Sequence, residues 1–133
     1  MRHSKFKILL ATLLLCAFAL SPAFTGCKSS PATTAVRVSD SAKVTVEAAL
    51  GAWDAYIVAN HPPLAQQAAV KKAWERYQAA QLLVLDTALI LKEAQATGGN
   101  TITAKATLDS AIANGGQAIA DLLALVRQFG AKI

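Results

Sequence analysis

The side chains best suited to chemistry in this chain are the thiols of Cys16 and Cys27 and the imidazole of His61. Cys27 ends the stretch Phe24-Thr25-Gly26-Cys27, and a thiol in that place can act as a free nucleophile or carry a lipid. Cys16 lies inside an apolar run, where we expect it only to fill space. His61 stands beside two prolines without a second histidine or cysteine to share a zinc ion, so we expect a solvent-facing turn residue.

The first twenty residues have the pattern of an export signal. Residues 1–7, MRHSKFK, are basic, and residues 8–20, ILLATLLLCAFAL, are apolar except for Thr12. This apolar run is shorter than the roughly 20 residues that a membrane-spanning helix needs. Ser21 and Pro22 then interrupt it. The order of basic, apolar and small residues predicts a signal peptide that is removed from the mature protein.

The stretch Phe24-Thr25-Gly26-Cys27 resembles the lipobox of bacterial lipoproteins, with Phe24 where that family usually has leucine. The resemblance covers residues 1–27 only. It implies that the Cys27 sulfur receives a diacylglyceryl group, and that cleavage before Cys27 frees its amine for a further acyl chain such as palmitate. Two or three acyl chains anchor a protein stably where one does not. Lys28 implies, by the same resemblance, the periplasmic face of the outer membrane if the host has two membranes.

A second interpretation of the same residues is ordinary secretory cleavage after Ala23. The protein would then be secreted or periplasmic, and Cys27 would be a lone thiol near a free N-terminus. Under either cleavage a single cysteine remains, so the mature chain cannot form an internal disulfide. The sequence thus leaves a lipoprotein, a secreted protein and an uncleaved N-terminal anchor as alternatives, and the lipobox favours the lipoprotein.

Charge and composition divide the chain into three parts and argue against nucleic-acid binding. We expect a signal peptide over 1–26, a lipid-anchored, flexible tether over 27–39 that is polar and contains Pro31, and a helical domain over 40–133. The formal charge of the whole chain is +5. Without residues 1–26, ten Lys/Arg and eight Asp/Glu remain, a net charge of +2. The basic residues form no block, so the electrostatic footprint of a nucleic-acid-binding protein is missing.

The helical domain is predicted to be all-α, an antiparallel three-helix bundle with helices at about 41–60, 63–96 and 103–129. Asn60-His61-Pro62-Pro63 and Thr97-Gly98-Gly99-Asn100 supply the breaks between them, because proline and glycine end helices. The last helix has heptad spacing and is expected to run continuously through Gly115-Gly116, although two helices broken there remain an alternative. Its apolar stripe comprises Leu108, Ile112, Gly115, Ile119, Leu122, Val126 and Phe129.

The middle of the second predicted helix, LLVLDTALIL at 82–91, is apolar on all sides. Because a three-helix bundle leaves part of each helix exposed, we expect a second copy or an envelope protein partner to cover Leu82, Leu85 and Ile90. Trp53 and Trp74 are expected to meet in the core near Pro62-Pro63. Alternatively, their rings form an exposed stacking platform for a ligand, which makes them further candidates for an interaction surface.

The remaining polar residues indicate solvated helix faces rather than a catalytic site. Lys43 and Glu47, like two other Lys–acid pairs, are spaced i,i+4 as on an exposed helix. No catalytic residue, metal site or cofactor site is predicted, and we do not expect an enzyme. The sequence predicts a small membrane-anchored lipoprotein with a structural or protein-interaction role in the cell envelope. The alternatives are a periplasmic binding or inhibitor module, and an envelope lipoprotein encoded by a phage or prophage.

Overall fold

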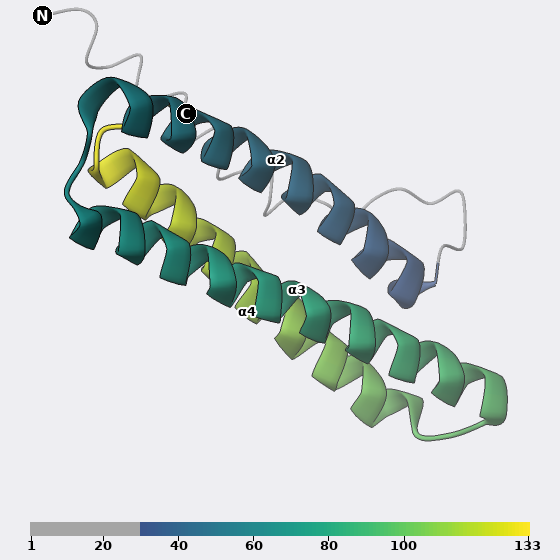
Figure 1. Cartoon of the computed structure of the whole chain (residues 1–133). Coiled ribbons are helices and arrows are strands. Elements are labelled where there is room, and N and C mark those ends of the chain that lie inside the picture. The colour runs from purple at the N-terminus through teal and green to yellow at the C-terminus, as the bar shows by residue number, and fades with distance from the viewer. Residues whose placement is uncertain (1–29) are drawn as a thin grey trace, which may run out of the picture.

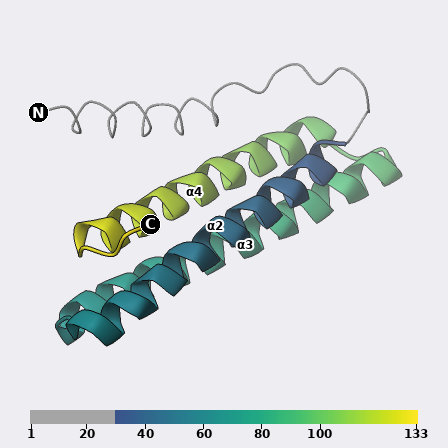
Figure 2. The same ribbon diagram turned by 90° about the horizontal axis from the view of Figure 1, so that it is seen from above.

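The computed structural model describes residues 30–133, which form three long helices joined by short turns (Figure 1). The helices are α2 (Pro31–Asn60), α3 (Leu64–Thr97) and α4 (Thr101–Gln128). They run antiparallel and pack against one another, which confirms the predicted all-α three-helix bundle (Figure 2). The predicted signal peptide and Cys27 lie outside the described residues. No helix within residues 30–133 is both long and apolar enough to cross a membrane.

The first helix begins at Pro31 rather than near Ser41, so the prediction of a flexible tether through residue 39 was wrong for residues 31–39. Ser30 caps the helix by accepting a hydrogen bond from the Thr33 N–H, and Pro31 occupies the first turn, where its missing N–H costs nothing. The inner face of this extension consists of small residues, whose weak hydrophobicity conceals the helical period. They are Ala32, Ala35, Ser39 and Ala42.

The two predicted breaks end their helices as expected. At the first, His61 adopts a left-handed conformation (φ 49°) and donates its backbone N–H to the Ile57 carbonyl, 2.9 Å away. Pro62 and Pro63 follow, and neither can continue a helix. At the second, Gly98 takes a left-handed conformation (φ 72°), which glycine adopts without steric cost. Asn100 then caps α4 through its side-chain oxygen, 3.0 Å from the Thr103 nitrogen.

The core has two halves of different character. Around the start of α2, small residues pack closely against α3 and α4; this cluster comprises Ala32, Ala35, Val84, Ala88, Leu91, Ala104, Leu108 and Ala111. Toward the α2–α3 turn, larger side chains fill the space; they include Val46, Trp53, Val70, Tyr77, Leu122 and Val126. Because α4 packs more extensively on α3 than α2 does, α2 is the less tightly held member of the bundle.

Helix α4 is continuous through Gly115-Gly116, as the sequence favoured. Gly115 is buried, and a Cβ placed on it would lie 3.6 Å from Val84 Cγ2, which is ordinary van der Waals contact. A Cβ on Gly116 would meet nothing within 4 Å. The two glycines therefore differ in role: Gly115 is buried against Val84 of α3, whereas Gly116 faces solvent.

We expect Gly116→Ala to raise the free energy of unfolding by about 1 kcal/mol, because alanine is the better helix former and no atom opposes its methyl group. Gly115→Leu should instead lower it by about 1–3 kcal/mol, since a large side chain at this close approach overpacks the core against Val84. Urea unfolding of the two variants measures both effects. Equal effects of the same sign would contradict the different roles of the two glycines.

Candidate interaction groove

An apolar groove runs between α2 and α3, starting near the turn that joins them. Its first part has a volume of about 520 Å³. Six large apolar side chains of the two helices, together with the stems of longer polar residues, form its surface. The lining residues are Leu50, Trp53, Ile57, Leu64, Gln67, Ala68, Val70, Lys71 and Trp74.

A second hollow of about 560 Å³ continues from the first toward the start of α2. Leu50 and Trp74 line both hollows, so the two form one continuous depression, the α2–α3 groove. Residues of both helices complete the second part: Ser39, Asp40, Lys43, Val46, Glu47, Tyr77, Gln78, Gln81, Leu82 and Leu85. The groove exists because α2 packs less closely on α3 than α4 does.

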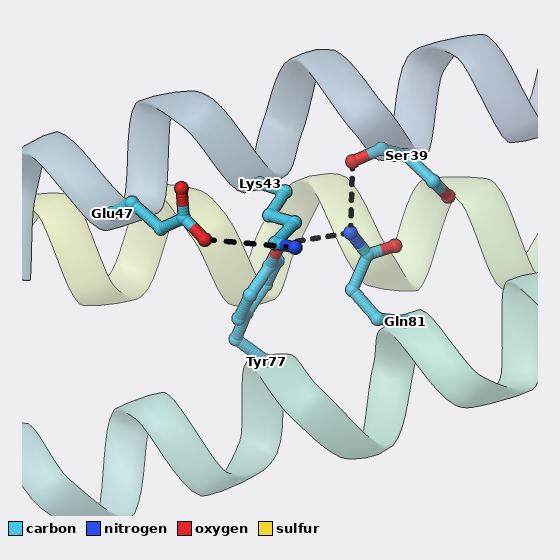
Figure 3. A network of polar contacts seen from close by, with 5 residues as sticks. All are labelled: Ser39, Lys43, Glu47, Tyr77 and Gln81. Atoms are coloured by element: carbon cyan, nitrogen blue, oxygen red, sulfur yellow. Dashed lines mark hydrogen bonds and ion pairs between the residues drawn. The ribbon is translucent and has the colours of Figure 1, made fainter.

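A polar contact ties the two walls of the groove together (Figure 3). The Gln81 Nε2 of α3 donates to the backbone carbonyl of Ser39 in α2, at 3.0 Å, and to the Tyr77 hydroxyl, at 2.8 Å. Gln81 interrupts the apolar stripe of its helix, and a lone polar residue on an inner stripe is the signal that could have revealed this bridge. The bridge fixes the spacing of α2 and α3 where large side chains give way to small ones.

The structure brings together only part of the predicted interaction surface. Leu82 and Leu85, which are 63% and 38% exposed, lie side by side on the α3 wall of the groove. Ile90 does not join them, because 3.6 residues per turn place it roughly 140° around the helix from Leu85. It lies roughly 80° from Leu82, on the same side of α3 as Leu83, and neither Ile90 nor Leu83 lines the groove. The groove lining thus includes Leu82 and Leu85 but not Ile90, and coverage of all three residues by a partner stays a prediction.

The two tryptophans have different environments. Trp53 is buried, and its ring stacks on Tyr56 with centroids 5.5 Å apart and lies 5.9 Å from the Phe129 ring. Trp74 is only half-buried and forms part of both sections of the groove. Trp53 belongs to the core cluster near the α2–α3 turn, and the partly buried Trp74 packs against that cluster. A pair of exposed stacking rings is absent at these two positions, since Trp53 has no free face.

Charged residues of both signs stand along the rims of the groove. On α2, Lys43 Nζ lies 3.7 Å from Glu47 Oε1 (Figure 3), and on α3, Lys71 Nζ lies 3.9 Å from Glu75 Oε1. All four side chains are more than half exposed, so these pairs contribute little to stability. Their effect is to leave an apolar floor between solvated edges, which is the arrangement of a surface that binds another apolar element.

The described part of the chain offers no metal-binding cluster: residues 30–133 contain no group of three or more His, Cys, Asp or Glu side chains placed to hold an ion. His61 is exposed at the α2–α3 turn. The groove can bind an apolar surface and remove it from water. The chain was compared with protein-family models, with curated proteins and with solved structures, and none of them matched it.

Proposed function

We propose that this protein is a lipid-anchored component of a bacterial cell envelope, attached through Cys27, with a structural or protein-interaction role. The observation that carries the interaction role is the α2–α3 groove, with the exposed Leu82 and Leu85 and the half-buried Trp74 along its α3 wall. The anchor rests on the lipobox-like residues that end in Cys27. The occupant of the groove is an amphipathic α-helix, supplied by an envelope protein or by a second copy of this chain.

The shape of the groove favours a helix as the occupant. It follows α3 from Leu64 to Leu85, about 30 Å along a helix axis. A helix of about five turns would lie along it and complete a four-helix bundle, in which facing apolar stripes fill a common core. Recognition of this kind uses anchors at i, i+3, i+4 and i+7 on the bound helix.

The charges on the rims are consistent with this occupant. Lys43 and Glu47 on one side, and Lys71 and Glu75 on the other, offer both signs to the polar flanks of a bound helix. Because Trp53 is buried, binding of a ligand by two stacked tryptophans has less support than helix binding. The apolar floor, rather than the aromatic pair, is the feature that gives the surface its affinity.

Exchanging Leu82 and Leu85 for lysine should abolish binding of the partner helix while leaving the bundle folded. Both side chains are exposed enough that their replacement changes stability by only about 0.5 kcal/mol or less. A lysine pair on the wall would have to lose its hydration when a helix enters, so binding becomes unfavourable. The measurement is photo-crosslinking in the envelope from a benzophenone amino acid at Gln78 in the groove, with the crosslinked peptide sequenced.

The matched control is the double variant Leu83→Lys and Ile90→Lys on the same helix, whose side chains do not line the groove and have comparable exposures of 46% and 55%. We expect a crosslink to a helical, amphipathic segment that survives in this control and disappears in the Leu82→Lys, Leu85→Lys variant. A peptide from this chain would identify a second copy as the occupant. Crosslinks that are equal in both variants would contradict the groove as the binding surface.

A further inference from the structure

The early start of α2 places its first turn very close to the proposed anchor. Only Lys28, Ser29 and Ser30 separate Cys27 from Pro31. The distance from the Cα of Cys27 to that of Pro31 can be at most about 14 Å, even for a fully extended chain. An anchor on Cys27 would therefore hold the N-terminal end of α2 near the bilayer surface, rather than at the end of a long tether.

The turn between α3 and α4 lies at this same end of the bundle. Ala32 and Ala35 of the first α2 turns pack in one cluster with Leu91 of α3 and Ala104 of α4. Beyond Leu91, α3 continues to Thr97 and its C-cap Gly98, which lies about 10 Å farther along the helix axis. Figure 1 shows the α3–α4 turn extending past the start of α2, so this hairpin tip projects toward the side where the anchor would lie.

The hairpin tip, residues 94–104, has a surface suited to a lipid interface. It contains no Asp, Glu, Lys or Arg, so no charged side chain of the tip has to be dehydrated when it approaches a bilayer. Ile102 is 84% exposed, the highest exposure among the large apolar side chains of the described residues. Nothing within the bundle covers it. Asn100 caps the adjoining helix start, which leaves fewer unsatisfied N–H groups at the tip.

We propose that the α3–α4 hairpin tip rests on the membrane that holds Cys27, with Ile102 inserted among the lipid headgroups. The occupant is a phospholipid surface, because the tip projects by about 10 Å and the segment that joins α2 to the anchor spans at most about 14 Å, so the tip and the anchor can reach the same bilayer. The bundle then stands upright, and the α2–α3 groove runs parallel to the membrane normal. This inference rests on the proposed anchoring at Cys27.

The test compares Ile102 with Leu64, which lies in the first turn of α3 at the opposite end of the bundle and is similarly exposed, at 81%. A benzophenone amino acid replaces one or the other. The chain beginning at Cys27 is coupled through that thiol to a maleimide lipid in vesicles of phosphatidylethanolamine and phosphatidylglycerol. After irradiation, phospholipid adducts are detected by intact mass. Because the lipid is attached chemically, the result does not depend on whether cells acylate Cys27.

We expect phospholipid adducts from position 102 and none above background from position 64. Equal adducts from the two positions would mean that the bundle lies flat on the bilayer, and no adducts from position 102 would mean that the tip stays in water; either result overturns the proposal. Failure of the proposed function itself would show separately, as Cys27 without acyl chains in protein extracted from cells. Circular dichroism of both variants confirms that the bundle is folded.

Discussion

Replacing Leu122 with alanine is expected to lower the free energy of unfolding by about 3 kcal/mol. Leu122 is fully buried in the cluster that contains Val46, Trp53 and Tyr77, where all three helices meet. Truncation there loses the transfer free energy of the buried atoms and leaves a cavity, which together cost about 2–5 kcal/mol. Against a total stability of about 5–15 kcal/mol for a domain, such a loss is large. Urea unfolding followed by circular dichroism measures it.

Ile102→Ala is the control for this experiment, because it removes an apolar side chain of similar size from a position exposed to solvent in the isolated protein. Its effect on unfolding in solution should be about 0.5 kcal/mol or less. If the two variants lost the same amount of stability, Leu122 would not be the centre of the packed core. A loss of stability in Leu122→Ala but not in Ile102→Ala would also show that Ile102 is not needed for folding, as the membrane role proposed for it requires.

Cys27→Ser is expected to move the protein from the membrane fraction to the soluble fraction of the envelope. The serine hydroxyl cannot take the place of the thiol that receives the diacylglyceryl group, so the acyl chains are lost together. Each buried CH₂ of such chains contributes about 0.8 kcal/mol to membrane binding, and their loss would leave only weak contacts such as the one proposed for Ile102. Fractionation of cells, with immunodetection of the protein, measures the change.

Cys16→Ser serves as the matched control, since Cys16 lies in the segment expected to be removed on export. The protein carrying this change should stay in the membrane fraction like the unmodified one. Secretory cleavage after Ala23 predicts the opposite pattern, with the original protein and both variants soluble. Membrane retention of Cys27→Ser equal to that of the original chain would contradict the anchor at Cys27.

Much of the fold could be predicted because strong local signals mark it. The Pro62-Pro63 and Gly98-Gly99 breaks end helices for stereochemical reasons that act within a few residues. The heptad stripe of α4 was readable because Leu108, Leu122 and Val126 are large and apolar, and each is buried as expected. Continuity through Gly115-Gly116 followed from the position of Gly115 on that stripe, where α4 approaches Val84.

The start of α2 could not be predicted because its inner face lacks large apolar residues. Ala32 and Ala35 are buried against α3 and α4, yet alanine is common on exposed helix faces as well, so its periodicity carries little information. In the sequence, Pro31 favoured a flexible tether. In the structure, Pro31 occupies the first turn of α2. The start of α2 depends on tertiary packing. Its small residues are buried because side chains of α3 and α4 pack closely against them.

The groove was only partly predictable for a related reason. The composition of 82–91 indicated an uncovered apolar surface, but all sides of that segment are apolar, so the sequence could not say which flank mattered. The open space beside α2 selects Leu82 and Leu85 and excludes Ile90. Gln81 was visible as an interruption, but its hydrogen bond to the Ser39 carbonyl depends on how α2 lies against α3.

The anchor proposed at Cys27 would determine where the groove and the hairpin tip operate, and the intact mass of the protein extracted from membranes tests it most directly. We expect a chain that begins at Cys27 and carries two or three acyl chains, with the modification mapped to that residue by fragmentation. A chain that begins at Phe24 and carries an unmodified Cys27 thiol would contradict the account.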